Sequence, residues 1–159
     1  MAKYGDLALK SVKYIKEFNL NVEEAWIKAA FEVFPNSDSS RTKGCPKNTF
    51  FGLCEDGLVL DVPMGNYTKS KKNKEYGLKA LELLNQQPEL AEDQMRLWKI
   101  VAGDEKAYNC QMDVVVSLFK QNRLVKWLLT KVTQSSNYED NLDGRLCENY
   151  KIILAMHNI

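Results

Sequence analysis

A mainly α-helical fold is predicted for this chain, as one compact domain of about six to seven helices. Three observations support the prediction. Apolar residues recur at intervals of three and four along most of the chain, which is the period of an amphipathic helix. Residues that favour helix N-caps, such as Asn21 and Ser70, precede two of these segments. Helix-breaking residues, including Pro35, Pro88 and Gly103, stand between segments.

The first two helices are the most clearly marked. The apolar side chains of residues 4–18 fall on one face, so the first helix is expected over that range. Asn21 is a typical N-cap, and Glu24 stands three residues later, where a capping-box partner belongs. The second helix is therefore expected over about residues 22–34, and Pro35 ends it.

The next helix follows a polar stretch, residues 36–44, that is expected to be a loop. Pro46 suits the first turn of the third helix, because a proline lacks the N–H that would have no partner there. Gly57 is expected just after this helix, since a left-handed ending favours glycine.

Three further helices are expected before residue 125. Ser70 caps the fourth, which extends to about Leu84. The fifth covers roughly residues 89–101 and the sixth roughly residues 109–121, each with a stripe of apolar side chains.

Residues 1–125 are predicted to form the helical core domain, and residues 126–159 a C-terminal extension that packs on the same domain. The start of the extension, KWLLTKVT, mixes leucine with β-branched residues and suits either a helix or a strand. A small β element is therefore an alternative, with residues 126–133 and 150–156 paired as a hairpin. The last segment has helical spacing and could cover the core of its own chain or pair with a second copy as a homodimer.

Composition restricts the class of protein. The chain has 159 residues, of which 45% are hydrophobic and 27% charged, and its net charge is +1. These values are typical of a globular domain and give no overall field that would attract nucleic acid or a membrane. No apolar run has the length of a membrane span, and the N-terminus lacks the unbroken apolar centre of a signal peptide. We therefore expect a cytoplasmic protein with no membrane partner, whose cysteines are thiols.

Three stretches carry a family resemblance. They are AWIKAAFEVFPNSDSSRTKGCPKNTFFGLCEDGLV (residues 25–59), GNYTKSKKNKEYGLKALELL (65–84) and NCQMDVVVSLFKQNRLV (109–125). Residues 25–125 resemble a family of small, uncharacterised bacterial proteins, a domain of unknown function, and the motif GCPK…FxGLCExGLV is its most specific feature. The resemblance implies one compact bacterial domain. It implies no activity, substrate or ligand.

Cys45 is the one candidate catalytic residue. At the start of the third helix its thiol would lie near free backbone N–H groups and cations, which lower a thiol pKa. A cysteine nucleophile normally needs a base, and the only histidine is His157, near the end of the chain. A small buried thiol in a tight turn is the favoured alternative.

No metal site or cofactor is expected. Cys45 and Cys54 are nine residues apart, which places them about 180° apart around a helix. The closely spaced cysteines and histidines typical of structural zinc are missing from the sequence.

Basic residues cluster around the starts of the third and fourth helices. Helix N-termini attract phosphate, and lysines add positive charge there. If the two starts share one face, they would form an anion-binding patch; the alternative is a solvated, lysine-rich loop. The candidate residues are Arg41, Lys43, Lys47, Tyr67, Lys69, Lys71, Lys72 and Lys74.

The favoured function is that of a small binding or regulatory protein whose basic patch faces nucleic acid or a phosphorylated small molecule. We favour this role over an enzyme. The first alternative is an enzyme that acts on a small anionic substrate through Cys45, and the second is a protein–protein interaction module.

Overall fold

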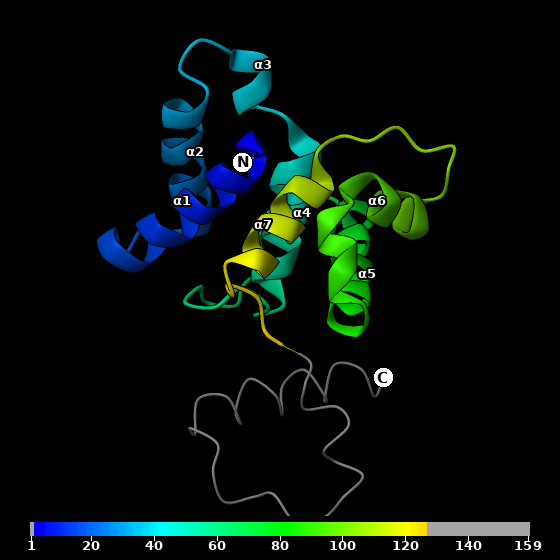
Figure 1. Cartoon of the computed structure of the whole chain (residues 1–159). Helices are drawn as coiled ribbons and strands as arrows, with labels where there is room; N and C mark the ends of the chain where they lie inside the picture. The colour runs from blue at the N-terminus through cyan, green and yellow to red at the C-terminus, as the bar shows by residue number, and fades with distance from the viewer. Residues whose placement is uncertain (1, 127–159) are drawn as a thin grey trace, which may run out of the picture. The chain divides into compact units, whose positions relative to one another are not determined.

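The computed structural model describes residues 2–126, and these residues form a mainly α-helical domain, as predicted (Figure 1). The chain divides into two compact units, Met1–Val125 and Lys126–Ile159. The predictions for the C-terminal segment, including its helix, hairpin and homodimer alternatives, fall on residues 127–159 and lie outside the described residues. The elements are α1 (Lys3–Phe18), α2 (Val22–Val33), α3 (Asp38–Arg41), α4 (Gly44–Glu55), α5 (Lys71–Gln86), the 3-10 helix η1 (Pro88–Glu92), α6 (Gln94–Ala102) and α7 (Gln111–Lys120).

The helix signals of the N-terminal part are confirmed. The side chain of Asn21 accepts the N–H of Glu24 at 2.9 Å, and the carboxylate of Glu24 accepts the N–H of Asn21 at 3.2 Å. This capping box satisfies two N–H groups that the first turn of α2 cannot satisfy itself. α2 ends at Val33, two residues before Pro35.

Two segments differ from the sequence prediction. The expected polar loop contains the short helix α3, which Ser37 caps through Ser40 N–H. The expected fifth helix is divided into η1 and α6, because Asp93 leaves the helical conformation and caps α6 by accepting Arg96 N–H at 2.9 Å. α4 begins at Gly44, so Pro46 lies in its first turn, as predicted.

The core lies where α1, α2, α4, α5 and α7 meet. α1 packs against α2 and α7, and α4 packs against α5 and α7. Trp26 of α2 stacks on Phe50 of α4, with ring centroids 5.3 Å apart. Gly5 brings α1 close to α7, since a Cβ at this position would lie 1.8 Å from the hydroxyl of Ser117.

The two helices α4 and α7 pack side by side, and the segments that follow them lie next to each other. Gly57, with φ of 70°, ends α4, and Leu58 N–H returns to the carbonyl of Leu53 at 3.0 Å. This is the ending predicted for Gly57. The segments that follow α4 and α7 then pair: Val125 N–H donates to Leu58 O at 3.0 Å, and Val59 and Leu124 form an isolated antiparallel bridge. No strand is formed within residues 2–126.

Among the described residues, none of the helices combines the length and apolar character needed to cross a membrane.

Candidate functional site

The N-terminal ends of α4, α5 and α7 come together, and we call this place the three-helix junction. Asn48 of α4 accepts the N–H of Lys69, just before α5, at 3.0 Å. Gln111, the first residue of α7, donates to the side chain of Asn73 in α5 at 3.2 Å. Lys43, which precedes α4, donates to the Cys110 sulfur before α7 at 3.5 Å. The two basic helix starts identified in the sequence are therefore neighbours, and a third helix start joins them.

The start of α4 has no side-chain cap, whereas the other two helix starts each have a side chain that accepts a first-turn N–H. Ser70 caps α5 by accepting Asn73 N–H. At α7 the N-cap Cys110 makes no such bond, but the hydroxyl of Tyr108 accepts the N–H of Asp113 at 3.1 Å. Uncapped N–H groups carry partial positive charge, and the helix dipole adds to it. The junction therefore combines backbone positive charge with that of nearby lysines.

The guanidinium of Arg41 is already bound by groups of its own domain. Its guanidinium donates to the carbonyls of Phe34 and Pro35 at 2.7 and 2.8 Å, which satisfies the end of α2. It also lies 4.5 Å from the ring centroid of Phe31 and forms an ion pair with Asp38. These contacts give Arg41 a structural role in joining α2 to α3.

Lys47 is also paired, although at a more exposed position. Its ammonium lies 2.9 Å from the carboxylate of Glu23 and 5.1 Å from the ring centroid of Phe51. The hydrogen bond from Lys47 lowers the pKa of Glu23, and the nearby charge of Lys69 lowers it further. Lys47 and Lys69 therefore lie near the same carboxylate.

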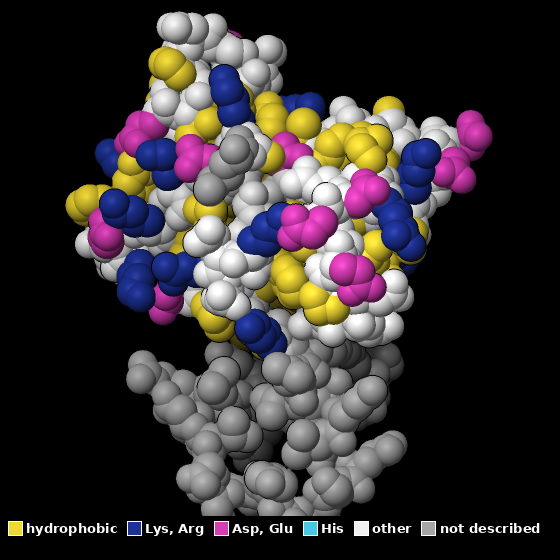
Figure 2. Space-filling model, in the orientation of Figure 1, with side chains coloured by type: hydrophobic (Ala, Val, Ile, Leu, Met, Phe, Trp, Pro, Cys, Tyr) yellow, Lys and Arg dark blue, Asp and Glu magenta, His cyan; other side chains and the backbone are white. Residues whose placement is uncertain are grey.

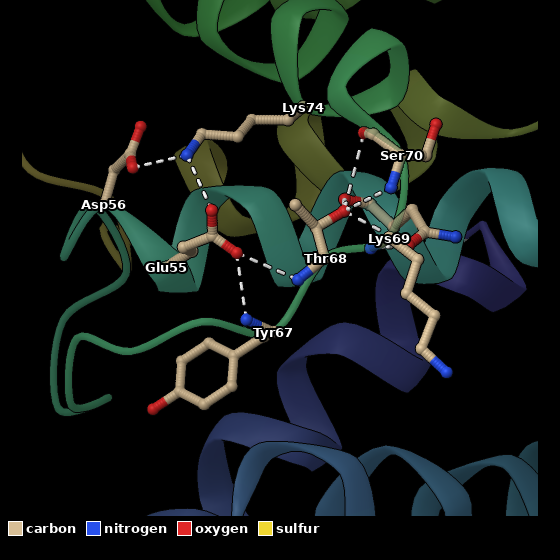
Figure 3. Close-up of polar contacts among 8 residues, drawn as sticks. Glu55, Asp56, Tyr67, Thr68, Lys69, Ser70 and Lys74 are labelled. Carbon is tan, nitrogen blue, oxygen red and sulfur yellow. Dashed lines mark hydrogen bonds and ion pairs between the residues drawn. The ribbon is translucent and has the colours of Figure 1, made fainter.

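Lys74 belongs to a polar cluster that fixes the loop before α5, and we call it the loop latch (Figure 3). Its ammonium lies 2.9 Å from Glu55 and 2.6 Å from Asp56. The second carboxylate oxygen of Glu55 accepts the N–H groups of Tyr67 and Thr68, each at 2.9 Å. Burial opposes the ionisation of Glu55, but these N–H groups and Lys74 outweigh it and lower its pKa.

The ring of Tyr67 points away from the latch (Figure 3). Its hydroxyl donates to the carbonyl of Pro63 at 2.9 Å, so it also closes the loop on itself. The side chain of Lys74 and the backbone N–H and hydroxyl of Tyr67 therefore already have partners within the fold.

Three of the predicted cations remain exposed. The side chains of Lys69, Lys71 and Lys72 form no hydrogen bond or ion pair with the rest of residues 2–126. The ammonium of Lys69 points away from the loop latch in Figure 3. Elsewhere charges are mixed: on the face seen in Figure 2, basic and acidic side chains alternate without a large field of one sign.

The sequence did not indicate a second thiol at the junction. Cys45 lies in the first turn of α4 and Cys110 precedes α7, and both are half-buried. Cys54 is fully buried, and burial raises its pKa. Cys110 has a positive φ of 66°, which few residues other than glycine and asparagine adopt. The position of Cys110 at a helix start was visible in the sequence, but its contact with Lys43, just before α4, was not.

Acidic and aromatic groups surround Cys110. Burial raises the pKa of Cys110, the charge of Asp113 raises it further, and Lys43 opposes both. Burial also raises the pKa of Asp113, whose carboxylate accepts the hydroxyl of Tyr108. Lys43 lies 5.5 Å from the ring centroid of Tyr4. Lys43 therefore lies between an aromatic ring and a thiol, with no carboxylate directly bound to it in the described part of the chain.

Metal-ligating side chains are dispersed. Within residues 2–126 no three histidine, cysteine, aspartate or glutamate side chains are grouped so that they could hold a metal ion. His157 lies outside the described residues.

The chain matches the model of a protein family. The family described as a family of unknown function (DUF6979) matches residues 1–125, which is the whole first unit and includes α1. No curated protein and no solved structure matches the chain. Since the match covers more than half of its length, the chain belongs to this family of unknown function.

Proposed function

We propose that this domain is a small binding protein that takes a phosphorylated small molecule at the starts of α4 and α5. The observation that carries the proposal is that Lys69, Lys71 and Lys72 flank a helix start without an ion pair in residues 2–126. Unneutralised lysines beside a helix N-terminus favour phosphate.

The arrangement of the neighbouring groups supports the same ligand class. Asn48 holds the start of α5 against α4, so the uncapped first turn of α4 lies close to Lys69. A phosphate there would meet backbone N–H groups and exposed ammonium groups together. Only three of the eight candidate residues are cations without a partner among the described residues, and the face seen in Figure 2 carries mixed charges, which favours a small anion over a long nucleic-acid backbone.

The cytoplasm is the compartment we propose for this function. Cys45, Cys54 and Cys110 are free thiols, which suits a reducing compartment. An enzyme that acts through Cys45 is the weaker alternative, because the only histidine in the chain is His157.

The test is a titration of the full chain with inorganic phosphate, a nucleoside monophosphate and a short single-stranded oligonucleotide, followed by NMR amide shifts. We expect shifts at Gly44, Cys45 and Lys47 and at residues 69–72. The double variant Lys71→Glu and Lys72→Glu should weaken binding at least about tenfold, since each reversal costs on the order of 1 kcal/mol at a surface site.

The matched control is the double variant Lys79→Glu and Lys106→Glu. These lysines are exposed, have no ion pair within residues 2–126, and change the net charge equally. We expect a change of less than about twofold, allowing for long-range screening by salt. Equal losses in both double variants would refute the proposal, as would a failure of all three probes to bind. Binding of the oligonucleotide alone would replace the small molecule with nucleic acid as ligand.

A further inference from the structure

The segment just before α5 is held by side chains of α4. The carboxylate of Glu55 accepts the N–H groups of Tyr67 and Thr68, each at 2.9 Å (Figure 3). Two turns earlier on α4, the side-chain oxygen of Asn48 accepts the N–H of Lys69 at 3.0 Å. Residues seven positions apart lie on one face of a helix, so a single face of α4 positions this segment.

The hydroxyl of Thr68 connects the two helix starts through Asn48. It accepts the N–H of Ser70 at 3.2 Å and donates to the side-chain oxygen of Asn48 at 3.1 Å (Figure 3). The amide nitrogen of Asn48 in turn donates to the carbonyl of Gly44, the first residue of α4, at 2.9 Å. Asn48 and Thr68 therefore join the first turn of α4 to the start of α5.

The next two backbone N–H groups along the chain are open. Those of Lys71 and Lys72, in the first turn of α5, have no acceptor within residues 2–126. The ammonium groups of these two residues and of Lys69 also have no partner in that part of the chain. The segment fixed by α4 therefore ends where open N–H groups and unpaired cations begin.

We infer that Asn48 and Thr68 are positioning residues of the anion site, and that the affinity of this site depends on whether they hold the loop between α4 and α5 closed. The inference rests on the proposed function and adds the groups that regulate it. Both side chains are uncharged and already hydrogen-bonded within the fold. They therefore act on a phosphate through the placement of Lys69 and of the first turn of α5.

Loop closure and phosphate binding favour each other for a thermodynamic reason. When the loop opens, the segment before α5 leaves α4, and Lys69 no longer lies beside the uncapped first turn of α4. The apparent affinity is then the intrinsic affinity multiplied by the fraction of molecules whose loop is closed. Coupling is reciprocal, so bound phosphate must in turn favour the closed loop.

The hydroxyl of Thr68 is tested by two uncharged variants. Thr68→Val keeps the shape of the side chain and removes the hydroxyl, whereas Thr68→Ser retains it. The full chain is titrated with inorganic phosphate, and the NMR amide shifts of Lys71 and Lys72 give the affinity. We expect an affinity at least about fivefold lower for Thr68→Val, and within about twofold of the unmodified chain for Thr68→Ser.

Asn48→Leu and Asn85→Leu form a matched pair. The side chain of Asn85, near the end of α5, likewise donates to the carbonyl four residues earlier, that of Leu81, at 2.9 Å. Asn48→Leu should weaken phosphate binding at least about fivefold, and Asn85→Leu less than about twofold. Circular dichroism shows that each variant is folded. Since none of these substitutions changes the net charge, a difference between them reports the placement of the site and not its electrostatic field.

Amide hydrogen exchange measures the loop itself. Thr68→Val should speed exchange at residues 67–70, and saturating phosphate should slow it in the unmodified chain. The inference fails if folded Thr68→Val and Asn48→Leu bind phosphate as tightly as the unmodified chain, or if Asn85→Leu loses as much affinity as Asn48→Leu; the proposed function would then stand without it. An unmodified chain that binds no phosphate would overturn both, so the two failures are distinguishable.

Discussion

Replacing Lys74 by methionine should destabilise the domain more than replacing any exposed lysine. The ammonium of Lys74 lies within 3 Å of both Glu55 and Asp56, and the three side chains are only 17–20% exposed. Methionine keeps the aliphatic stem that covers Gly52, where a Cβ would lie 2.6 Å from Lys74 Cβ. The substitution therefore removes the charge and its hydrogen bonds while largely preserving the packing.

The size of the effect follows from the degree of burial. Breaking a fully buried ion pair by removing one partner costs about 3–5 kcal/mol, because a charge is left unpaired. A fully exposed pair is worth less than about 1 kcal/mol. At one-fifth exposure, with two carboxylates left behind, we expect a loss of about 2–3 kcal/mol in the free energy of unfolding.

Urea unfolding at pH 7, followed by far-UV circular dichroism, measures this loss. A domain of this size should also melt roughly 5–10 °C lower. The control is Lys47→Met, which removes a single ion pair to Glu23 whose side chains are 27% and 60% exposed. We expect the control to lose less than about 1 kcal/mol. Equal losses in the two variants, or a loss below about 0.5 kcal/mol for Lys74→Met, would refute the reasoning about the latch.

Two further outcomes concern the same end of α4. The lowered pKa of Glu55 means that its ionised form is favoured in the folded state. Its contribution to stability is therefore complete above its ordinary pKa, about 4.3, and disappears as the pH falls through the lower folded value. Urea unfolding between pH 6 and pH 3 should show a smaller loss of stability for Glu55→Gln than for the unmodified chain; parallel curves would contradict this. Gly57→Ala should cost about 1–3 kcal/mol, because φ is 70° and the new Cβ would lie 2.8 Å from Met64. Gly44→Ala is its control, since its nearest contact would be an ordinary 3.7 Å and its φ is not positive, and a similar loss there would argue against conformational strain.

Local signals made most of the fold predictable. The helix caps predicted at Asn21, Ser70 and Gly57 depend on hydrogen bonds between residues no more than five positions apart. Both partners of each bond are therefore visible in one short stretch of sequence. The break at Asp93 was missed because the apolar spacing continues across it. One continuous helix would place Asp93 in a helix interior, whereas two helices place it at an N-cap. An aspartate suits the N-cap better.

The candidate site was less predictable because its partners are distant in sequence. Lys47 binds Glu23, and Lys74 binds Glu55, which are 24 and 19 positions away. Clustering of cations along the chain does not reveal which of them are neutralised in this way. Lys71 and Lys72, in contrast, remain exposed at a helix start, so their place in the anion-binding prediction is unchanged.

The packing of α1 on α7 has a consequence for synthesis on the ribosome. Gly5 contacts the region of Ser117, and the segment after α4 pairs with Leu124 and Val125. The apolar face of α1 that packs on α7 is therefore covered only after α7, the last helix of the first unit, has been synthesised. Until α7 has been made, α1, α4 and α5 each expose the face that α7 covers. Contacts so far apart in sequence slow folding, and a nascent chain that ends before α7 is a natural client for a chaperone.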